Sequence, residues 1–352
     1  MSLAALLLLL LPADRYFALD AVRRPGYWRS HVPRWTLDAL RLLVGLVYVY
    51  AGLAKLNSDW LLAAQPLRIW LPAKNDLPVL GPLFNYPATA YAFSWFGAFY
   101  DLTVPFFLLY RPTRPLAFVA VIVFHVLTAV LFPIGMFPYV MMVAALVFFP
   151  AETHARWLGQ ARRLWYWATA YFGGRGGVAR AASGPPRPAA VLTYRARPRL
   201  VLLVSLALFF VVQLLVPLRY ALYPSELFWS EEGYRFSWRV MLMEKLGQVQ
   251  FRVVDGATGR ARMVDNGKHL SILQEKMMST QPDMILQFAH YLRDYYARRG
   301  VQAPQVYADT YVSLNGRLGQ PLVDPAVDLA QEEEGFGAKR WVLPFQGEIS
   351  GL

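Results

Sequence analysis

The chain has no cysteine, few charged residues and none of the common catalytic motifs. Without a thiol, disulfide bonds, thiolate catalysis and cysteine-ligated metals are excluded. The sequence contains no His-Glu-x-x-His, no Gly-x-Ser-x-Gly, no phosphate-binding loop and no dinucleotide fingerprint. Its five histidines are scattered without the spacing of metal ligands, so we expect no metal site. Charged residues make up only 16% of the chain and hydrophobic residues 56%, which is too apolar for an ordinary soluble domain.

Apolar runs that are candidates for membrane spans recur through the first two thirds of the chain. A spanning helix needs about 20 mostly apolar residues, and the candidates are Trp35–Leu56, Ala88–Tyr110, Pro115–Phe132, Ile134–Phe149 and Leu200–Leu218. The apolar segment Met1–Pro12 is too short to cross, and it lacks the basic region and cleavage site of a signal peptide. We interpret it as the tail of a spanning helix. The sequence thus predicts an α-helical integral membrane domain over residues 1–220, with about five full spans and a partial first one.

Positive charge is concentrated before residue 224. Residues 1–223 hold 21 Lys and Arg against 7 Asp and Glu, whereas residues 224–352 hold 14 against 16, which together give the net charge of +12. The excess of positive charge lies in three loops: Asp14–Arg34, Arg111–Arg114 and Arg156–Arg199. If successive spans cross the membrane in alternate directions, all three loops lie on the same side. The positive-inside rule makes that side cytoplasmic. Residues 151–199 are therefore predicted to be a basic cytoplasmic loop, and topology rather than nucleic-acid binding explains the charge.

A different pattern follows Pro224. Short segments of alternating polarity, separated by turn residues, predict strands at Tyr234–Met243, Gln248–Val254, Ala261–Val264 and Gln305–Leu314. Helical spacing of apolar residues predicts a helix at Asp283–Arg299. We expect a strand-rich α+β domain over residues 221–352 on the extracytoplasmic side. Richness in Ala and Arg is typical of a high-GC bacterial gene, so the expected location is a bacterial inner membrane.

Lys55 is the most informative ionisable residue, because it stands at the outer end of the predicted span Trp35–Leu56. Its position alone favours a lysine that snorkels to lipid headgroups. The functional interpretation is a partly desolvated amine whose pKa falls until it can act as a base. Asp59 could pair with it, but a stable ion pair would raise the pKa of the amine, so a structural role for Asp59 is expected.

Two further ionisable residues, His125 and Asp101, fall within predicted spans. Such groups are expensive at membrane depth, so they are either functional or paired with each other or with backbone. The run Leu131–Met142 is rich in methionine and aromatic residues. Such a cluster is usually helix packing, but it also suits a flat, apolar cofactor.

Three blocks of this sequence resemble the vitamin K-dependent γ-glutamyl carboxylase family, whose membrane part is called the HTTM domain. They are Tyr48–Trp60, Phe124–Met141 and Pro304–Arg317, the last continuing through Leu322–Asp328. A weaker fourth block is Tyr234–Met241. The blocks occur in family order from one end of the chain to the other.

The resemblance implies a reaction. In the family, a lysine deprotonates reduced vitamin K, which reacts with oxygen to give a strong base. That base removes a γ-proton from glutamate, and carbon dioxide adds to give γ-carboxyglutamate and the quinone epoxide. Lys55 takes the place of the family lysine, and His125 matches a family histidine that we group with it as catalytic. The implied cofactor is reduced vitamin K or a related quinol, with oxygen and carbon dioxide as co-substrates.

The resemblance also implies binding residues. The quinone-binding candidates are Tyr48, Met136, Phe137, Met141 and Met241. Arg68 and Trp70 are substrate-binding candidates, with Arg68 for the substrate carboxylate because a guanidinium binds a carboxylate bidentately. The expected partners are the lipid bilayer and a glutamate-containing peptide or protein, and no nucleic acid.

The sequence departs from the family pattern at three places. The family has earlier spanning helices and an Asn-His motif that helps the lysine, whereas this chain opens at the end of that region without the motif. The pair of lysines in the animal enzyme is Ala54-Lys55 here, and the chain ends at Leu352 without the animal propeptide-binding region. The alternative hypothesis is therefore a non-catalytic or truncated member that binds a quinone or lipid, with Lys55 directed to solvent or bonded to Asp59.

Overall fold

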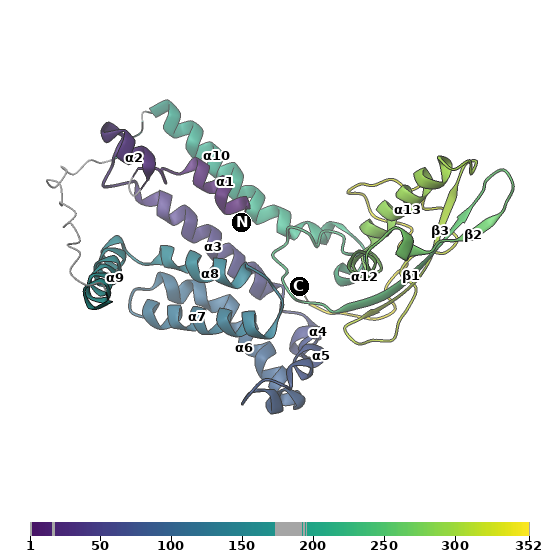
Figure 1. Cartoon of the computed structure of the whole chain (residues 1–352), viewed down its shortest axis with the longest axis horizontal. Coiled ribbons are helices and arrows are strands. Elements are labelled where there is room, and N and C mark those ends of the chain that lie inside the picture. The colour runs from purple at the N-terminus through teal and green to yellow at the C-terminus, as the bar shows by residue number, and fades with distance from the viewer. Residues whose placement is uncertain (1, 16–17, 173–191, 193, 195, 352) are drawn as a thin grey trace. The chain divides into compact units, whose positions relative to one another are not determined.

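The computed structural model describes residues 2–15, 18–172, 192, 194 and 196–351 (Figure 1). The chain forms two compact units, each built from two separate stretches. Unit 1 comprises Met1–Tyr48 and Thr103–Val212, and unit 2 comprises Val49–Leu102 and Gln213–Leu352. Three long helices, α3 (Arg34–Leu53), α6 (Pro87–Leu109) and α10 (Ala196–Leu215), belong partly to each unit.

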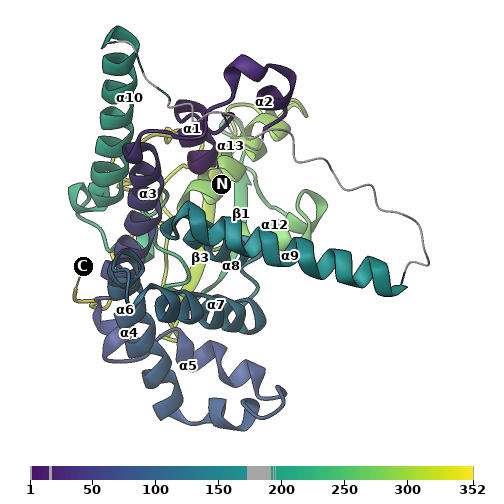
Figure 2. The same ribbon diagram turned by 90° about the vertical axis from the view of Figure 1, so that its left-hand side faces the viewer.

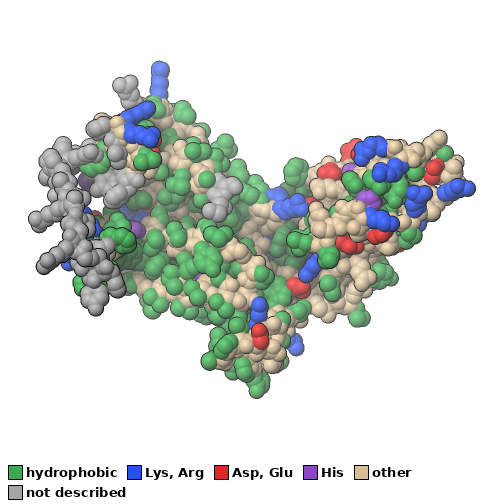
Figure 3. Space-filling model, in the orientation of Figure 1, with side chains coloured by type: hydrophobic (Ala, Val, Ile, Leu, Met, Phe, Trp, Pro, Cys, Tyr) green, Lys and Arg blue, Asp and Glu red, His purple; other side chains and the backbone are tan. Residues whose placement is uncertain are grey.

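Unit 1 is helical. Besides its parts of α3, α6 and α10 it contains α1 (Ser2–Leu10), α2 (Leu19–Arg23), the 3₁₀ turn η1 (Pro25–Tyr27), α7 (Arg114–Leu131), α8 (Phe137–Ala144), η4 (Ala145–Phe148) and α9 (Ala151–Phe172). Exposed apolar side chains line α7, where lipid replaces water around a membrane helix: Leu116, Val119, Val123, Val126 and Val130. Hydrophobic side chains likewise cover much of the helical face in Figure 3.

The core of unit 1 joins its first helix to two spanning helices. Leu7 of α1 packs in one cluster with Leu43 of α3 and Phe209 of α10. Figure 1 shows α1 and α10 running side by side. Within the apolar segment at the start of the chain, α1 is thus a short helix that packs against two helices long enough to span a membrane. In the same part of α3, Arg41 Nε donates to the carbonyl of Val147 at 3.1 Å, which ties this helix to η4.

Four helices in the described residues are long and apolar enough to cross a membrane: Arg34–Leu53, Pro87–Leu109, Arg114–Leu131 and Arg197–Leu222. The expected full span at Ile134–Phe149 is not one of them, since its helix begins only at Phe137. The segment Phe137–Phe148 continues into α9 through a bend of 117°, so the pair counts as a fifth span only if both halves are joined. Gly135 has φ +60°, and Pro133 and Pro138 cannot donate a helical hydrogen bond, which explains the late start of α8.

Unit 2 combines short helices with a three-stranded sheet. The helices are α4 (Ser58–Leu61), α5 (Leu67–Trp70), η2 (Pro72–Lys74), η3 (Gly81–Asn85), η5 (Val216–Leu222), α11 (Leu227–Ser230), η6 (Asn266–Lys268), α12 (Ile272–Met278) and α13 (Pro282–Ala297). The strands are β1 (Lys245–Val254), β2 (Ala261–Met263) and β3 (Gln305–Leu314). The prediction of a mixed domain after the spans is confirmed.

The sheet is antiparallel, in the order β2-β1-β3. Strands β1 and β3 pair over their full length, from Lys245 opposite Leu314 to Val254 opposite Gln305. Alternate residues of β1 are buried, and Phe251 meets Phe288 of α13 with ring centroids 5.1 Å apart. The period of two that predicted these strands therefore reflects one face packed against a helix.

The prediction of a strand at Tyr234–Met243 is wrong. This segment is an irregular loop in which Phe236, Trp238 and Met241 all have positive φ, between +54° and +61°. A strand requires φ near −120°, and non-glycine residues rarely adopt the left-handed region. The alternation of polarity in this segment therefore arises from a folded loop. Strained backbone of this kind is concentrated at functional sites.

Candidate active site

Lys55 lies in the tight turn that joins α3 to α4. Its backbone N–H donates to the carbonyl of Gly52 at 3.0 Å, which closes the last turn of α3. Asn57 then holds both sides of the turn: its Nδ2 donates to the carbonyl of Ala54, and its Oδ1 accepts from the N–H of Trp60, each at 2.9 Å. Asparagine is a favoured N-cap residue. The turn therefore fixes the backbone on both sides of Lys55.

The Lys55 amine is bonded to Asp101, a residue of α6. Nζ donates to Asp101 Oδ2 at 2.7 Å and to the carbonyl of Ala51 at 3.1 Å. The two side chains are only 9% and 7% exposed. Burying two charges is favourable only when each is paired at good geometry. The non-catalytic alternative requires Lys55 to be directed to solvent or bonded to Asp59. The structure shows neither arrangement, because Lys55 is buried and bonded to Asp101.

The face of α6 that carries Asp101 also lies against Lys55 and Trp60. Ser94, Gly97 and Asp101 are spaced three and four residues apart, so they lie on one side of the helix. The Trp60 indole donates to the carbonyl of Ser94 at 2.8 Å, and the Lys55 Nζ lies 5.3 Å from the Trp60 ring centroid. A Cβ at Gly97 would contact both Trp60 and Lys55. The amine is thus enclosed by an aromatic ring, a carboxylate and bare helix backbone.

The close approach of α3 and α6 depends on Gly52. A Cβ at this position would lie 2.7 Å from Leu102 Cγ and 2.9 Å from the Leu102 backbone nitrogen. Only glycine leaves room for that contact, which is the usual way in which membrane helices approach closely. Gly52 therefore sets how near the end of α3 comes to the helix that supplies Asp101.

Asp59 is bonded to two residues of the turn that follows β3. Its carboxylate accepts from Arg317 Nη1 and Nη2 at 2.7 and 2.6 Å, and from Asn315 Nδ2 at 2.6 Å. The hydrogen bonds to Asp59 raise the pKa of Arg317. Asn315 and Gly316 both have positive φ, so β3 ends in a tight turn that presents these donors. Asp59 thus ties the Lys55 turn to β3, in keeping with the structural role expected for it.

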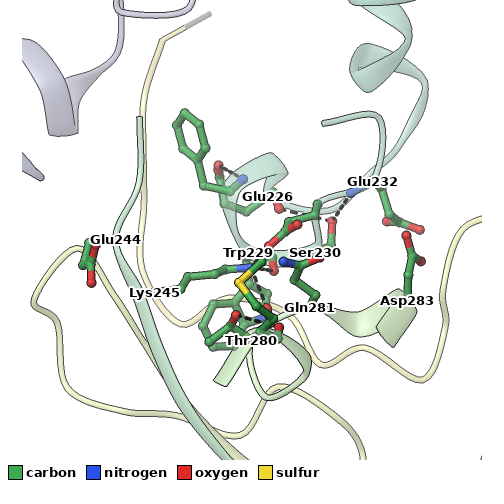
Figure 4. A network of polar contacts seen from close by, with 12 residues as sticks. Glu226, Trp229, Ser230, Glu232, Glu244, Lys245, Thr280, Gln281 and Asp283 are labelled. Carbon is green, nitrogen blue, oxygen red and sulfur yellow. Dashed lines mark hydrogen bonds and ion pairs between the residues drawn. The ribbon is translucent and has the colours of Figure 1, made fainter. Parts of the chain in front are cut away.

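Trp70 and Arg68 lie on the short helix α5. The Trp70 indole donates to Glu244 Oε2 at 2.6 Å, whereas the Arg68 side chain is exposed. Figure 4 shows Glu244 directed away from the cluster that its neighbour Lys245 enters. Lys245 donates to the carbonyl of Trp229 at 2.7 Å and to Glu231 at 2.9 Å, and burial lowers its pKa. This anchor at the start of β1 holds Glu244 in reach of Trp70.

In unit 1 the structure brings three of the expected residues together. The Tyr48 hydroxyl and His125 Nε2 are 2.9 Å apart, and both residues are buried. The Phe137 ring lies 6.4 Å from the His125 ring. Met141 is buried as well, whereas Met136 is 65% exposed. The expected alternative of a His125–Asp101 pair is wrong, because His125 is bonded to Tyr48 and Asp101 to Lys55.

Sequence reasoning missed a small pocket beside the Lys55 turn. Its volume is about 190 Å³, and its lining includes Asn57, Tyr220, Glu226, Arg239 and Gly351. The Arg239 guanidinium lies 4.4 Å from the Tyr220 ring centroid, and burial lowers its pKa. Burial also raises the pKa of Glu226. The only sequence signal for this pocket is the clustering of polar residues that begins after the last span.

The remaining candidates are placed as follows. Met241 is half-buried in the irregular loop of unit 2 and has φ +54°. Among the described residues, no group of three or more His, Asp and Glu side chains is arranged to hold a metal ion. The Lys55–Asp101 pair and the Tyr48–His125 pair are both buried polar contacts among the described residues.

Comparison with known proteins identifies the two parts of the chain. Residues 1–153 match the family model of the HTTM domain, and residues 198–348 match that of the lumenal domain of vitamin K-dependent gamma-carboxylase. No solved structure matches the chain. The two matches follow one another along the sequence and leave few residues uncovered. The chain therefore belongs to the vitamin K-dependent gamma-carboxylase family.

Proposed function

We propose that this γ-carboxylase-like, multi-pass membrane protein is an enzyme that couples the oxidation of a reduced quinone to the carboxylation of glutamate side chains, with Lys55 as the base. The observation that carries the proposal is the Lys55–Asp101 pair, in which an amine and a carboxyl group lie 2.7 Å apart out of water. Ionisable groups at membrane depth are costly and are usually functional.

The pair is suited to moving a proton. Burial disfavours both charges of the pair, so the shared proton can lie on either atom, unlike in a solvent-exposed ion pair, which stays charged. With that proton on Asp101, Lys55 is a free amine that can accept a proton from a quinol hydroxyl. The resulting ammonium, whose charge is balanced by the deprotonated quinol oxygen, is kept in place by its hydrogen bond to Asp101 Oδ2. Trp60 and the backbone of Gly97 restrict water around the amine, and a dry site strengthens each of these electrostatic interactions.

The quinone candidates of unit 1 fit a flat ring that carries oxygens. Phe137 and Met141 supply aromatic and polarizable surface, and the Tyr48–His125 pair supplies a buried hydroxyl and imidazole. When bound, reduced vitamin K or a related quinol supplies, with oxygen, a base strong enough to remove the γ-proton of glutamate before carbon dioxide adds. The Tyr48–His125 pair would orient a quinol oxygen, because the hydrogen bond between the two side chains fixes where their polar atoms lie. Met136 and Met241 remain part of this proposal as further contacts.

The glutamate-containing peptide or protein would be bound by unit 2. The exposed guanidinium of Arg68 is available to a carboxylate, while Trp70 is held by Glu244. Arg239 offers a second guanidinium in the small pocket beside the Lys55 turn. We further propose the division into a membrane domain over residues 1–220, with a cytoplasmic loop at 151–199, and an extracytoplasmic domain over residues 221–352, in a bacterial inner membrane.

The test is incorporation of labelled carbon dioxide into a glutamate peptide by the full chain, with reduced vitamin K and oxygen. Lys55→Ala should lower incorporation at least about a hundredfold, the usual contribution of a positioned base. Lys268→Ala removes an exposed ammonium from η6 and should leave incorporation unchanged. Equal incorporation by Lys55→Ala and the unmodified chain would overturn the proposal.

A further inference from the structure

Helix α9 differs from the spanning helices of unit 1. It follows η4 after the 117° bend, and Figure 2 shows it extending away from α7 and α8. Of the five exposed large apolar residues described on it, four lie on one face, with spacings of one, seven and eight residues from Trp157: Trp157, Leu158, Leu164 and Trp165. The fifth, Trp167, lies outside that face. Arg156 and Arg163 lie on the opposite side. A helix with these two faces is typical of one that lies in the membrane interface.

A pocket opens where α9 begins. Its volume is about 490 Å³, and it lies between the turn that joins α6 to α7 and the first two turns of α9. Three arginines and one carboxylate line it, namely Arg111, Arg114, Arg156 and Glu152. The structure thus brings together two of the three basic segments that the sequence analysis puts on one side of the membrane.

The three guanidiniums are not neutralised within the described part of the chain, where no ion pair joins any of them to a carboxylate. Arg114 donates to the carbonyls of Leu108 and Leu109 at 2.8 and 3.0 Å, which closes the end of α6 and holds the charge in the pocket. Arg156 makes only long contacts of 3.3 and 3.4 Å within α9. The pocket therefore keeps a positive excess of two charges over Glu152.

One wall of the same pocket is aromatic. Phe149 lies 5.1 Å from Trp157 and 5.1 Å from Phe118, measured between ring centroids. Tryptophan side chains favour the headgroup level of a bilayer, where one edge is wet and the other apolar. The pocket thus combines guanidiniums that bind phosphate with rings that pack against glycerol and the first methylenes of an acyl chain.

We propose that this pocket binds the headgroup of an anionic phospholipid and that α9 lies along the membrane surface beside it. Basic pockets beside membrane helices on the cytoplasmic side recognise anionic headgroups. A lipid satisfies both the guanidiniums and the aromatic wall, whereas a free phosphate ion leaves the aromatic wall without a partner. The site shares no residue with the Lys55–Asp101 pair and does not depend on the carboxylation proposed above.

The first test measures lipid binding to the full chain in a neutral detergent, by native mass spectrometry with phosphatidylglycerol or phosphatidylcholine. We expect phosphatidylglycerol to bind preferentially and the double variant Arg111→Gln/Arg156→Gln to bind it at least about tenfold more weakly. Arg114 is kept because it closes α6. Arg111→Lys/Arg156→Lys, which retains both charges, should bind more tightly than the glutamine pair. Arg260→Gln/Arg298→Gln, which removes two exposed charges from unit 2, should bind normally.

Three results would overturn the lipid site: equal phosphatidylglycerol binding by the glutamine pair, equal affinity for phosphatidylcholine, or complete displacement of lipid by millimolar inorganic phosphate. The second test uses the absence of native cysteine. A spin label at Leu164→Cys in nanodiscs should be accessible to oxygen, and one at Arg163→Cys to a water-soluble nickel complex. Equal accessibility to the nickel complex at both positions would place α9 away from the bilayer and contradict the interfacial helix.

Discussion

Gly351 forms an antiparallel bridge with Asn57, so the last described residues lie against the turn that carries Lys55. The Ser58 N–H donates to the carbonyl of Ser350 at 2.7 Å, and the Ser350 N–H donates to Ser58 Oγ at 3.0 Å. A Cβ at Gly351 would lie 2.3 Å from the carbonyl oxygen of Leu56, and its φ of +127° also favours glycine. Segment 348–351 is therefore a strap over the Lys55 turn.

Gly351→Ala should release this strap. The added methyl group cannot fit against Leu56, so the Ser58 amide loses its acceptor and its hydrogen exchange should quicken at least about tenfold. Mass spectrometry of peptides spanning residues 55–61 measures the change. Gly337→Ala is the matched control, because nothing lies within 4 Å of the added Cβ. Unchanged exchange at Ser58 in Gly351→Ala would show that the strap does not hold the turn.

Asp101→Asn should impair proton transfer at Lys55 while the protein stays folded. The amide keeps the size of the carboxyl group but cannot carry the shared proton, so the rate of quinol epoxidation should fall about ten- to a hundredfold. Asp101→Ala leaves the buried amine without its partner and should destabilise the protein by about 3–5 kcal/mol. Asp76→Asn, at an exposed carboxylate, serves as the control. Normal epoxidation by Asp101→Asn would remove Asp101 from the mechanism.

Gly52→Ala should push α3 and α6 apart. The new methyl group would meet Leu102 at 2.7 Å, and overpacking of this kind costs about 1–3 kcal/mol. Thermal unfolding in detergent should show a lower midpoint. Gly45→Ala lies on the same helix, but its Cβ would meet only Pro105, at 3.9 Å. We expect that control to be neutral or slightly stabilising, and equal midpoints for the two variants would show that the close approach at Gly52 is unimportant.

Glu226 should make the stability of unit 2 depend on pH. Burial raises the pKa of Glu226 in the folded state, so the folded chain retains a proton that the unfolded chain releases above about pH 4.3. The folded state binds more protons in this window, and its stability therefore falls as pH rises from about 4 through the folded pKa.

Glu226→Gln removes that titration and should raise the unfolding midpoint at pH 7 by about 1–2 °C, a small effect because the carboxyl group is partly screened by solvent. The difference should vanish near pH 4. Glu333→Gln, at an exposed carboxylate, should show no such dependence. A midpoint difference for Glu226→Gln that is the same at both pH values would contradict the buried-carboxyl explanation.

Sequence patterns predicted those parts of the fold that depend on local periodicity. Strand β3 and helix α13 alternate buried and exposed residues with periods of two and 3.6, so their bounds were close to those observed. The loop at Tyr234–Met243 shows a similar alternation, but its left-handed residues are set by tertiary contacts that no local pattern reveals. The span predicted at Ile134–Phe149 follows from hydropathy alone, which reveals neither the late start of α8 nor the 117° bend between Phe148 and α9, because both depend on backbone geometry and packing.

The candidate site was predictable only one residue at a time. Lys55 and Asp101 were each recognised as costly ionisable residues, but 46 residues separate them, and periodicity does not say which helix faces which. The same holds for Tyr48 and His125, which are 77 residues apart. Asp59 was assigned a structural role because it would weaken the base, whereas its partner Arg317 lies in another part of the sequence.

The bond between Asp59 and Arg317 has a consequence for biosynthesis. The two residues are 258 positions apart, so a ribosome exposes Asp59 long before its guanidinium partner exists. The nascent chain must keep this carboxylate hydrated until Asn315 and Arg317 emerge, because a buried carboxylate without donors is unstable. The turn that carries Lys55 therefore reaches its described form only after nearly the whole chain has been made, although the partners of the Lys55 amine, Trp60 and Asp101, are translated much earlier.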